Sequence, residues 1–149
     1  MMNEVICQKA IELDKEEISS LSAQWEKENI TYGYVAFSPG LLFEYSAFCA
    51  KINNKCIGYL FGKKIIAENI CVFPDGSSYF EIEDFYIKPE FRNQGIGKQL
   101  YEFVEQTLKQ EGTQGILLSS ATKNYKRVQE FYTSQVGMKV WTTTFYKII

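Results

Sequence analysis

The sequence predicts one mixed α/β domain over residues 1–149, with the element order β-α-(α)-β-β-β-α-β-α-β. A chain of 149 residues has the size of a single domain. Runs of alternating apolar and polar residues are interspersed with runs whose apolar residues recur at helical spacing. Tight turns connect the strands of the front half, whereas helices separate those of the back half. Part of the sheet must therefore run parallel.

The front half predicts a strand, a helix and a hairpin. Residues 5–10 form the strand. Asp14 is expected to cap the helix, with Glu17 three residues later as in a capping box. This helix is expected to end near Asn29. The hairpin has strands at residues 46–52 and 56–66, joined by a turn at residues 53–55.

Residues 31–45 combine five aromatic side chains with a Ser-Pro-Gly sequence. A loop or short helix of this composition either packs against the core or forms the wall of a substrate site. The sequence leaves both alternatives open.

The back half predicts two strand-helix units and a final strand. A strand over residues 79–87 closes at Pro89, and a helix over 95–109 ends near Gly112. A short apolar strand and a second helix follow. The last segment alternates as a strand or strand pair. These three elements are residues 116–118, 125–135 and 138–149.

Composition excludes several classes of function. The net charge of −2 and the pI of about 5.3 argue against a nucleic-acid partner. The absence of histidine excludes Ser-His and Cys-His mechanisms. The four cysteines lack C-x-x-C spacing, so we expect free thiols in a reducing cytoplasm and no metal site. We also expect no signal peptide and no membrane span.

The junction at residues 87–99 is the most informative segment. It leads from a strand into a helix and carries Arg92, Gln94, Gly95 and Gly97 in close order. The first amides of a helix have no intrahelical partner, and the helix dipole adds partial positive charge there. The junction therefore predicts an anion site, and a diphosphate-bearing cofactor is the first hypothesis.

The same residues resemble the signature of the GCN5-related N-acetyltransferases, the GNAT superfamily. Arg92-x-x-Gly95-x-Gly97 fits that signature after the lead-in Ile87-Lys88-Pro89, and the element order matches over nearly the whole chain. The resemblance implies acetyl-CoA as cofactor. It implies that the backbone amides of the loop hold the pyrophosphate, namely those of Arg92, Asn93, Gln94, Gly95, Ile96, Gly97 and Lys98.

The resemblance also implies a splayed pair of parallel strands with the pantetheine arm between them. The backbone groups facing it would belong to Phe85, Tyr86 and Ile87, with a donor for the oxyanion near Tyr86. The neighbouring strand would be residues 116–120. A bulge near residues 84–86 would re-aim side chains at the site.

In the following helix the resemblance places Asn124 toward the cofactor and Tyr132 next to its sulfur. Val128-x-x-Phe131-Tyr132 matches the family pattern, but Asn124 stands one residue early. The gap from Tyr132 to Gly137 is one residue longer than in the family pattern, which indicates a one-residue shift in this helix. Tyr132 would protonate the departing thiolate. The alternative is an ordinary core tyrosine.

Three acids directly precede the loop. Glu83 and Glu81 are expected on one face of the strand, with Asp84 on the other unless a bulge intervenes. Glu83 first, and Glu81 second, would take the proton of the amine or hold a cationic substrate. Solvated strand positions are the alternative. The stretch Glu83-Asp84-Phe85-Tyr86 is similar to that of family members acting on polyamines and other small amines.

Together these features predict an acetyl-CoA-dependent N-acetyltransferase whose acceptor is a small cationic amine. A protein N-terminus, a lysine or an aminoglycoside are alternative acceptors. A non-catalytic acyl-CoA sensor is an alternative class. The C-terminal residues 145–149 would permit a homodimer through an edge strand.

Overall fold

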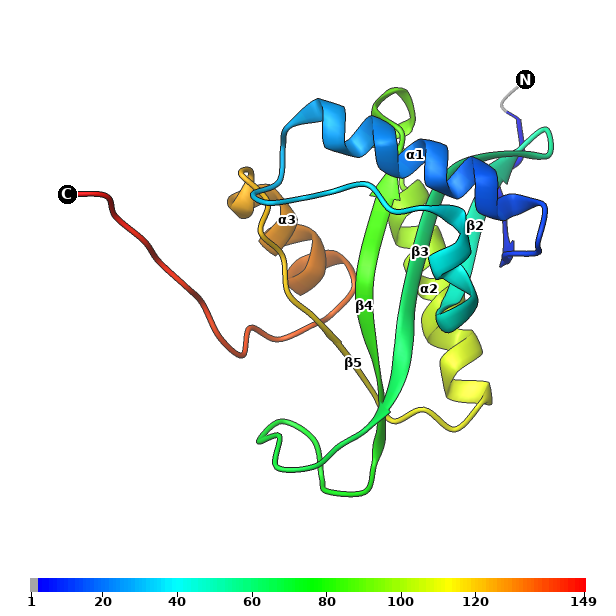
Figure 1. Ribbon diagram of the computed structural model, residues 1–149. Helices are drawn as coiled ribbons and strands as arrows, with labels where there is room; N and C mark the ends of the chain where they lie inside the picture. Colours follow the sequence, from blue (N-terminus) through cyan, green and yellow to red (C-terminus); the bar gives the residue numbers. More distant parts are fainter. Residues whose placement is uncertain (1–2) are drawn as a thin grey trace.

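The computed structural model describes residues 3–149. In it the chain forms one five-stranded sheet with helices on both faces (Figure 1). Its order is β1-β2-β3-β4-β5, antiparallel except for the parallel pair β4–β5. The strands are Ile6–Lys9, Ser46–Ile52, Lys55–Ile66, Ser78–Ile87 and Gly115–Leu118. The α-helices are α1 (Asp14–Glu28), α2 (Ile96–Gln110) and α3 (Tyr125–Glu130), and short 3₁₀ turns cover Pro39–Glu44 and Pro89–Phe91. The predicted mixed α/β fold is thus confirmed.

Two apolar clusters fill the spaces between the sheet and its helices. On one face α2 packs against the sheet through a cluster that includes Leu60, Phe80 and Leu100. On the other face α1 and residues 37–45 cover a cluster built around Ile18 and Tyr59. The sheet is therefore the middle layer of three, and residues 56–62 of β3 are buried on both faces.

The predicted hairpin turn and the predicted end of the first helix are confirmed by left-handed asparagines. Asn53 and Asn54 have φ of 50° and 63° between β2 and β3, as a tight hairpin turn requires. Asn29 ends α1 with φ of 53°. Asparagine adopts this conformation more readily than most other residues.

The capping box predicted at the start of α1 is wrong. The N-cap position is Leu13, without a side-chain cap bond. Asp14 is buried instead, where it accepts a hydrogen bond from Ile11 N and pairs with Lys51 Nζ at 2.6 Å. Glu17 accepts a hydrogen bond from Cys56 N at 2.7 Å. Both carboxylates find stronger partners around the sheet, and they tie α1 to β2 and β3.

The predicted helix over residues 125–135 contains the expected one-residue shift. After α3 the chain makes a π-helical turn over Phe131–Gln135, in which Val136 N donates to Phe131 O at 3.2 Å. A π turn accommodates one extra residue within a helix and is frequent at functional sites.

The final strand predicted for residues 138–149 is not formed. Beyond Met138 the chain is extended, exposed and directed away from the domain (Figure 1). The alternating pattern is present, but within residues 3–149 no neighbouring strand pairs with it. Among the same residues, no helix is both long enough and apolar enough to cross a bilayer.

Candidate functional site

The start of α2 presents free backbone amides. The first intrahelical bond of α2 runs from Gln99 N to Gly95 O at 3.0 Å, so the amides of residues 96–98 precede any helical acceptor. Gly95 has φ of 82°, a conformation that glycine adopts at no cost, and no acidic side chain occupies the first turn. The amides and the dipole of this 15-residue helix are therefore arranged to bind an anion.

Gly97 lies where α2 meets β4 and the π turn. A Cβ added there would lie 3.7 Å from Phe131 and 3.8 Å from Ile87. These are ordinary contact distances, so alanine would fit, whereas a large side chain would collide with Phe131 or cover the free amides.

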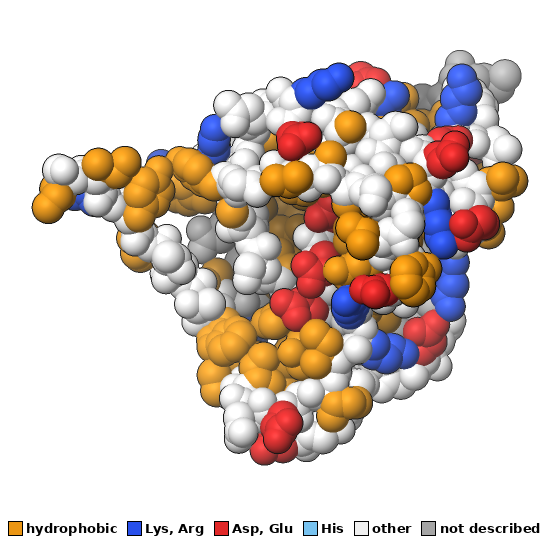
Figure 2. Space-filling model, in the orientation of Figure 1, with side chains coloured by type: hydrophobic (Ala, Val, Ile, Leu, Met, Phe, Trp, Pro, Cys, Tyr) orange, Lys and Arg blue, Asp and Glu red, His pale blue; other side chains and the backbone are white. Residues whose placement is uncertain are grey.

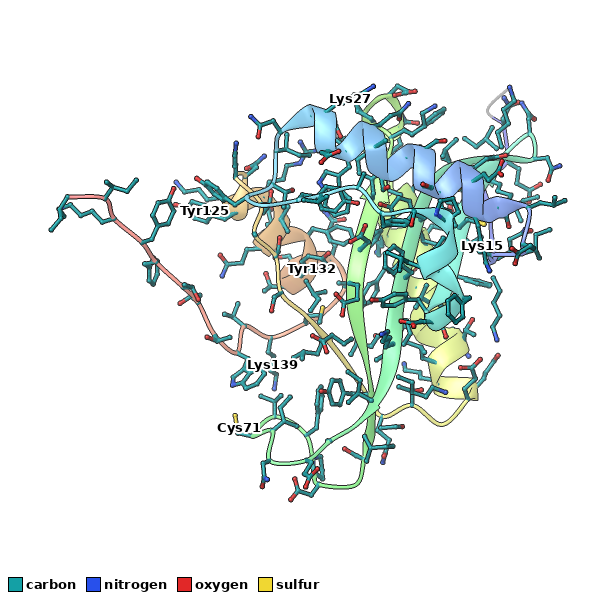
Figure 3. All side chains as sticks on the ribbon, in the orientation of Figure 1. Lys15, Lys27, Cys71, Tyr125, Tyr132 and Lys139 are labelled. Carbon is teal, nitrogen blue, oxygen red and sulfur yellow. The ribbon has the colours of Figure 1, made fainter. Side chains whose placement is uncertain are left out.

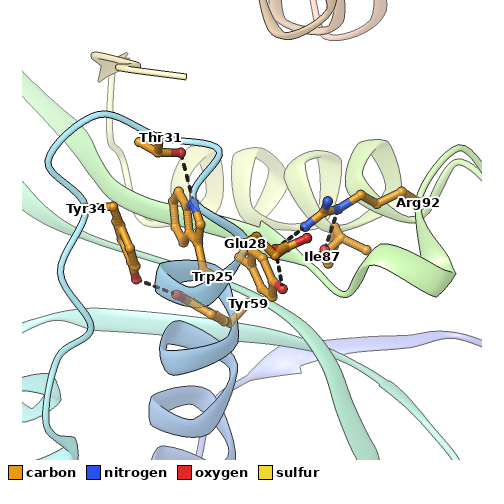
Figure 4. A network of polar contacts seen from close by, with 8 residues as sticks. Trp25, Glu28, Thr31, Tyr34, Tyr59, Ile87 and Arg92 are labelled. Atoms are coloured by element: carbon orange, nitrogen blue, oxygen red, sulfur yellow. Dashed lines mark hydrogen bonds and ion pairs between the residues drawn. The ribbon is translucent and has the colours of Figure 1, made fainter. Parts of the chain in front are cut away.

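The Arg92 side chain, in the loop before α2, binds groups of the protein itself. Its Nε donates to Ile87 O at 2.8 Å, and its terminal nitrogen donates to Glu28 Oε2 at 2.9 Å (Figure 4). Tyr86 OH donates to the same Glu28 oxygen at 2.7 Å. Arg92 thus fastens the end of α1 to the loop. Lys98 is exposed at the start of α2, where its Nζ lies 3.8 Å from Glu102 Oε1 in a loose surface ion pair.

The outer edge of β4 becomes free halfway along the strand. Its parallel pairing with β5 ends at Ile82 and Leu118, although β4 continues to Ile87. Lys88 N donates to Ile57 O, so by alternation the amide of Tyr86 faces β3 and those of Phe85 and Ile87 face the free edge. The two strands therefore diverge as expected. The free amides near Tyr86 are those of its two neighbours, Phe85 and Ile87.

The far end of this free edge is closed by a separate bridge. Thr31 pairs with Thr122, supported by hydrogen bonds from Tyr32 N to Ala121 O at 2.9 Å and from Lys123 N to Ile30 O at 2.8 Å. The chain after β5 is therefore held by the α1 side of the domain rather than by β4.

Tyr132 lies in the π turn on the side that faces β4 (Figure 3). Its ring centroid is 6.5 Å from that of Phe85, and Phe131 contacts the same ring at 6.0 Å. Burial, followed by the nearby Tyr101, raises the pKa of the Tyr132 hydroxyl. The hydroxyl therefore stays protonated at neutral pH beside the free edge of β4.

A β-bulge on β4 changes the direction of its acids. Phe61 pairs with Asp84 and Gly62 with Ile82, which leaves Glu83 as the extra residue. Ile82 belongs to the apolar cluster on the α2 face, whereas Asp84 bonds to residues on the α1 face. The bulge thus turns Asp84 to the α1 face. Glu83 is exposed and Glu81 is half-buried.

Asp84 is a candidate site residue that the strand pattern alone placed behind Glu83 and Glu81. Its Oδ2 accepts hydrogen bonds from Tyr34 OH at 2.6 Å and from Tyr59 OH at 2.9 Å. Burial raises the pKa of Asp84 and the charge of Glu83 adds to the rise, although the two tyrosines oppose it. In the sequence, Gly62 is the residue that could have indicated the bulge, because a Cβ at this position would collide with Glu81 O of the neighbouring strand.

Aromatic rings line the α1 side of this acid. Trp25 stacks on Tyr34 with centroids 3.9 Å apart and lies 5.4 Å from Tyr86. Trp25 Nε1 donates to Thr31 Oγ1 at 3.0 Å, which fixes the ring (Figure 4). Phe37, in contrast, packs edge-on against Tyr59. Residues 31–45 therefore contribute to core packing through Phe37, and Tyr34 from the same segment lies against Asp84.

The molecular surface shows acidic side chains gathered in a hollow beside β4, with apolar groups around them (Figure 2). A separate hollow of about 1280 Å³ lies between α1, the β2–β3 turn and the start of α2. It includes Gln94 and Gln99 but no residue of β5 or α3, so it is distinct from the free edge of β4.

Asn124 is exposed at the start of α3, and its side chain does not cap the helix. Gln94 folds back onto the loop, where its Nε2 donates to Glu90 O at 3.0 Å. Asn93 adopts a left-handed conformation with φ of 63°. The left-handed backbone of Asn93 and the side chain of Gln94 thus shape the loop, while Asn124 stays a predicted contact.

Comparison with protein families gives one match that spans most of the chain. The model described as "Acetyltransferase (GNAT) family" matches residues 10–138. An uncharacterized N-acetyltransferase in the pepI 3′ region of Lactobacillus delbrueckii subsp. lactis is 31% identical over 98 residues, which cover 66% of this chain and 52% of that protein. The chain therefore spans about half the length of this curated relative.

Several solved structures share the fold. The tetramutant of the BH1408 protein from Bacillus halodurans has a TM-score of 0.75 at 17% identity, covering 97% of this chain and 99% of that one. An aminoglycoside acetyltransferase from an uncultured soil metagenomic sample, in complex with sisomicin, has a TM-score of 0.71 at 19% identity, covering 97% and 96%. The ribosomal-protein-alanine N-acetyltransferase of Brucella melitensis biovar Abortus 2308 also reaches 0.71, at 14% identity, covering 97% and 99%.

Proposed function

Because the chain belongs to the acetyltransferase (GNAT) family, we propose that it is an acetyl-CoA-dependent N-acetyltransferase acting directly on a primary amine. One observation carries the proposal. The unpaired amides of residues 96–98 lie beside the unpaired edge of β4, and Tyr132 faces that same edge. An anion site, a free strand edge and a protonated hydroxyl are what binding and cleaving a CoA thioester require.

The residues of this chain divide the binding of acetyl-CoA among them. The amides of Ile96, Gly97 and Lys98 bind the diphosphate, and Lys98 adds a positive charge. The backbone amides of Phe85 and Ile87 are shared between the amide groups of the pantetheine arm and the oxyanion that forms at its thioester. Ile87 O already accepts a hydrogen bond from Arg92, so we expect it to make no strong bond to the arm.

The chemical step requires the protein to assist at three atoms: the amine nitrogen, the carbonyl oxygen and the thioester sulfur. The amine must lose a proton before it attacks, the carbonyl oxygen becomes negative, and the thiolate leaves. Asp84 accepts the amine proton, directly or through water, because its raised pKa brings it closer to that of a useful base. A free amide of β4 stabilises the oxyanion, and Tyr132 donates its proton to the sulfur.

We propose a small cationic amine as the acceptor. Asp84, Glu81 and Glu83 supply negative charge beside the free edge. Trp25, Tyr34 and Tyr86 supply ring faces that attract a cation. Glu28 is neutralised by Arg92 and contributes less to this attraction.

Thiol release from acetyl-CoA with a panel of amines tests the proposal. The panel contains a polyamine, an aminoglycoside and a peptide with an N-terminal alanine. We expect turnover that depends on the polyamine and saturates with it. Turnover on the peptide alone would contradict the acceptor class. Tight binding of acetyl-CoA without turnover on any amine would contradict the proposed enzymatic activity and favour a non-catalytic acyl-CoA sensor.

A further inference from the structure

The C-terminal segment, residues 140–149, is a strand-forming sequence that the fold leaves unpaired. Nine of its ten residues are β-branched or aromatic, the types enriched in strands. Phe145 and Ile148 are 89% and 87% exposed. Within residues 3–149 the segment makes no backbone hydrogen bond to the domain. Tyr146 packs edge-on against Tyr32 and its hydroxyl donates to Tyr32 OH at 3.3 Å.

The same chain also carries an open sheet edge. Strand β5 is the last in the sheet order of the described residues. Gln114 N donates to Ser78 O on the β4 side, so by alternation the amides of Leu117 and Ser119 face outward. Exposed edges of this kind pair with other strands unless they are covered.

We propose that two copies of this chain form a dimer in which each C-terminal segment pairs with β5 of the other copy. The exchange is reciprocal, because every chain supplies one unpaired strand and one open edge. A two-fold axis satisfies both at once. In one chain the segment extends away from its own β5, as Figure 1 shows, which makes it available to a neighbour.

The apolar surface of the segment is large enough for a stable interface. Trp141, Phe145 and Tyr146 are 46%, 89% and 72% exposed. An aromatic side chain buries about 150–250 Å². Two segments therefore bury on the order of 1,000 Å² before the aliphatic side chains are added, which reaches the range of specific interfaces.

Light scattering after size exclusion, combined with hydrogen exchange, tests the dimer. We expect a mass of twice 17.2 kDa for the native chain. The amides of residues 140–149, and those of Leu117 and Ser119, should exchange slowly. A monomer would overturn the proposal, whether or not its C-terminal segment is protected. So would a dimer whose C-terminal segment exchanges freely.

Two phenylalanine variants make the test specific. Phe145→Asp should weaken the dimer at least about 30-fold, as loss of a central aromatic contact does. Phe43→Asp is the matched control, since Phe43 is 74% exposed and lies in the 3₁₀ turn Pro39–Glu44. The control should change the dissociation constant by less than about twofold. Equal effects of the two variants would overturn the proposal.

Discussion

The acid that matters most at the residue scale is Asp84. A one-residue bulge turns its side chain toward the α1 face, where Tyr34 and Tyr59 both donate to the same oxygen. Burial raises the pKa of this carboxyl, so the folded chain holds its proton more tightly than the unfolded chain. The contribution of Asp84 to stability is therefore full below its unfolded pKa, and it is lost as the pH rises through the folded pKa.

Asp84→Asn should remove this pH dependence. Asparagine does not ionise, and its carbonyl oxygen can still accept from both tyrosines. The free energy of unfolding of the native chain, minus that of Asp84→Asn, should fall as the pH rises from about 3 to neutrality. Urea unfolding across this range measures it. If this difference in unfolding free energy is constant or rises with pH, the pKa of Asp84 is not raised in the folded chain.

Tyr132→Phe should lower kcat by about 100-fold or more while the affinity for acetyl-CoA stays the same. The variant removes only the hydroxyl, so the packing on Phe85 and Phe131 is kept. Steady-state kinetics and calorimetry provide the two measurements. Tyr125→Phe, an exposed position in α3, is the control. Unchanged turnover in Tyr132→Phe would make this residue a packing tyrosine.

At the scale of elements, the strand β4, its loop and α2 could be predicted because local rules fix them. A strand pattern, a proline, two glycines and a helical pattern follow one another at residues 79–109. The direction of Asp84 and the partner of Arg92 could not be predicted, since they depend on contacts with distant residues. The bulge arises from the approach of Gly62 to β4, and Arg92 meets Glu28 from α1.

Gly97→Trp should abolish measurable binding of acetyl-CoA. An indole at this position would collide with Phe131 or cover the amides of residues 96–98. Calorimetry measures the affinity, and circular dichroism checks that the chain is folded. Gly40→Trp is the control, because Gly40 has no neighbour within 4 Å of an added Cβ. Full affinity in a folded Gly97→Trp variant would contradict the assignment of the loop.

The ion pair between Asp14 and Lys51 fastens α1 to β2. The two side chains are only 5% and 8% exposed. Lys51→Met leaves Asp14 buried without its partner and should cost about 3–5 kcal/mol of unfolding free energy. Lys15→Met removes the pair with exposed Glu12 and should cost about 0–1 kcal/mol. Denaturant unfolding compares the two. Similar losses would mean that the buried pair does not hold the helix.

At the scale of the whole molecule, the sequence patterns predicted the order of elements from β1 to α3 but not the fate of residues 138–149. An alternating segment indicates that a strand can form. It does not indicate which edge is within reach, and that depends on where the chain leaves α3. The extra residue between Tyr132 and Gly137 pointed to the irregular helix, and the π turn at Phe131–Gln135 accommodates it.

The central claim of this account is that acetyl-CoA binds along the free edge of β4 with its diphosphate at the start of α2. Backbone ¹H–¹⁵N chemical shifts during a titration with acetyl-CoA test this claim most directly. We predict the largest shifts at the amides of Ile96, Gly97 and Lys98, together with those of Phe85 and Ile87. Unchanged shifts at Phe85, Ile87, Gly97 and Lys98, with changes confined to the hollow between α1 and the β2–β3 turn that Ile96 also lines, would contradict it.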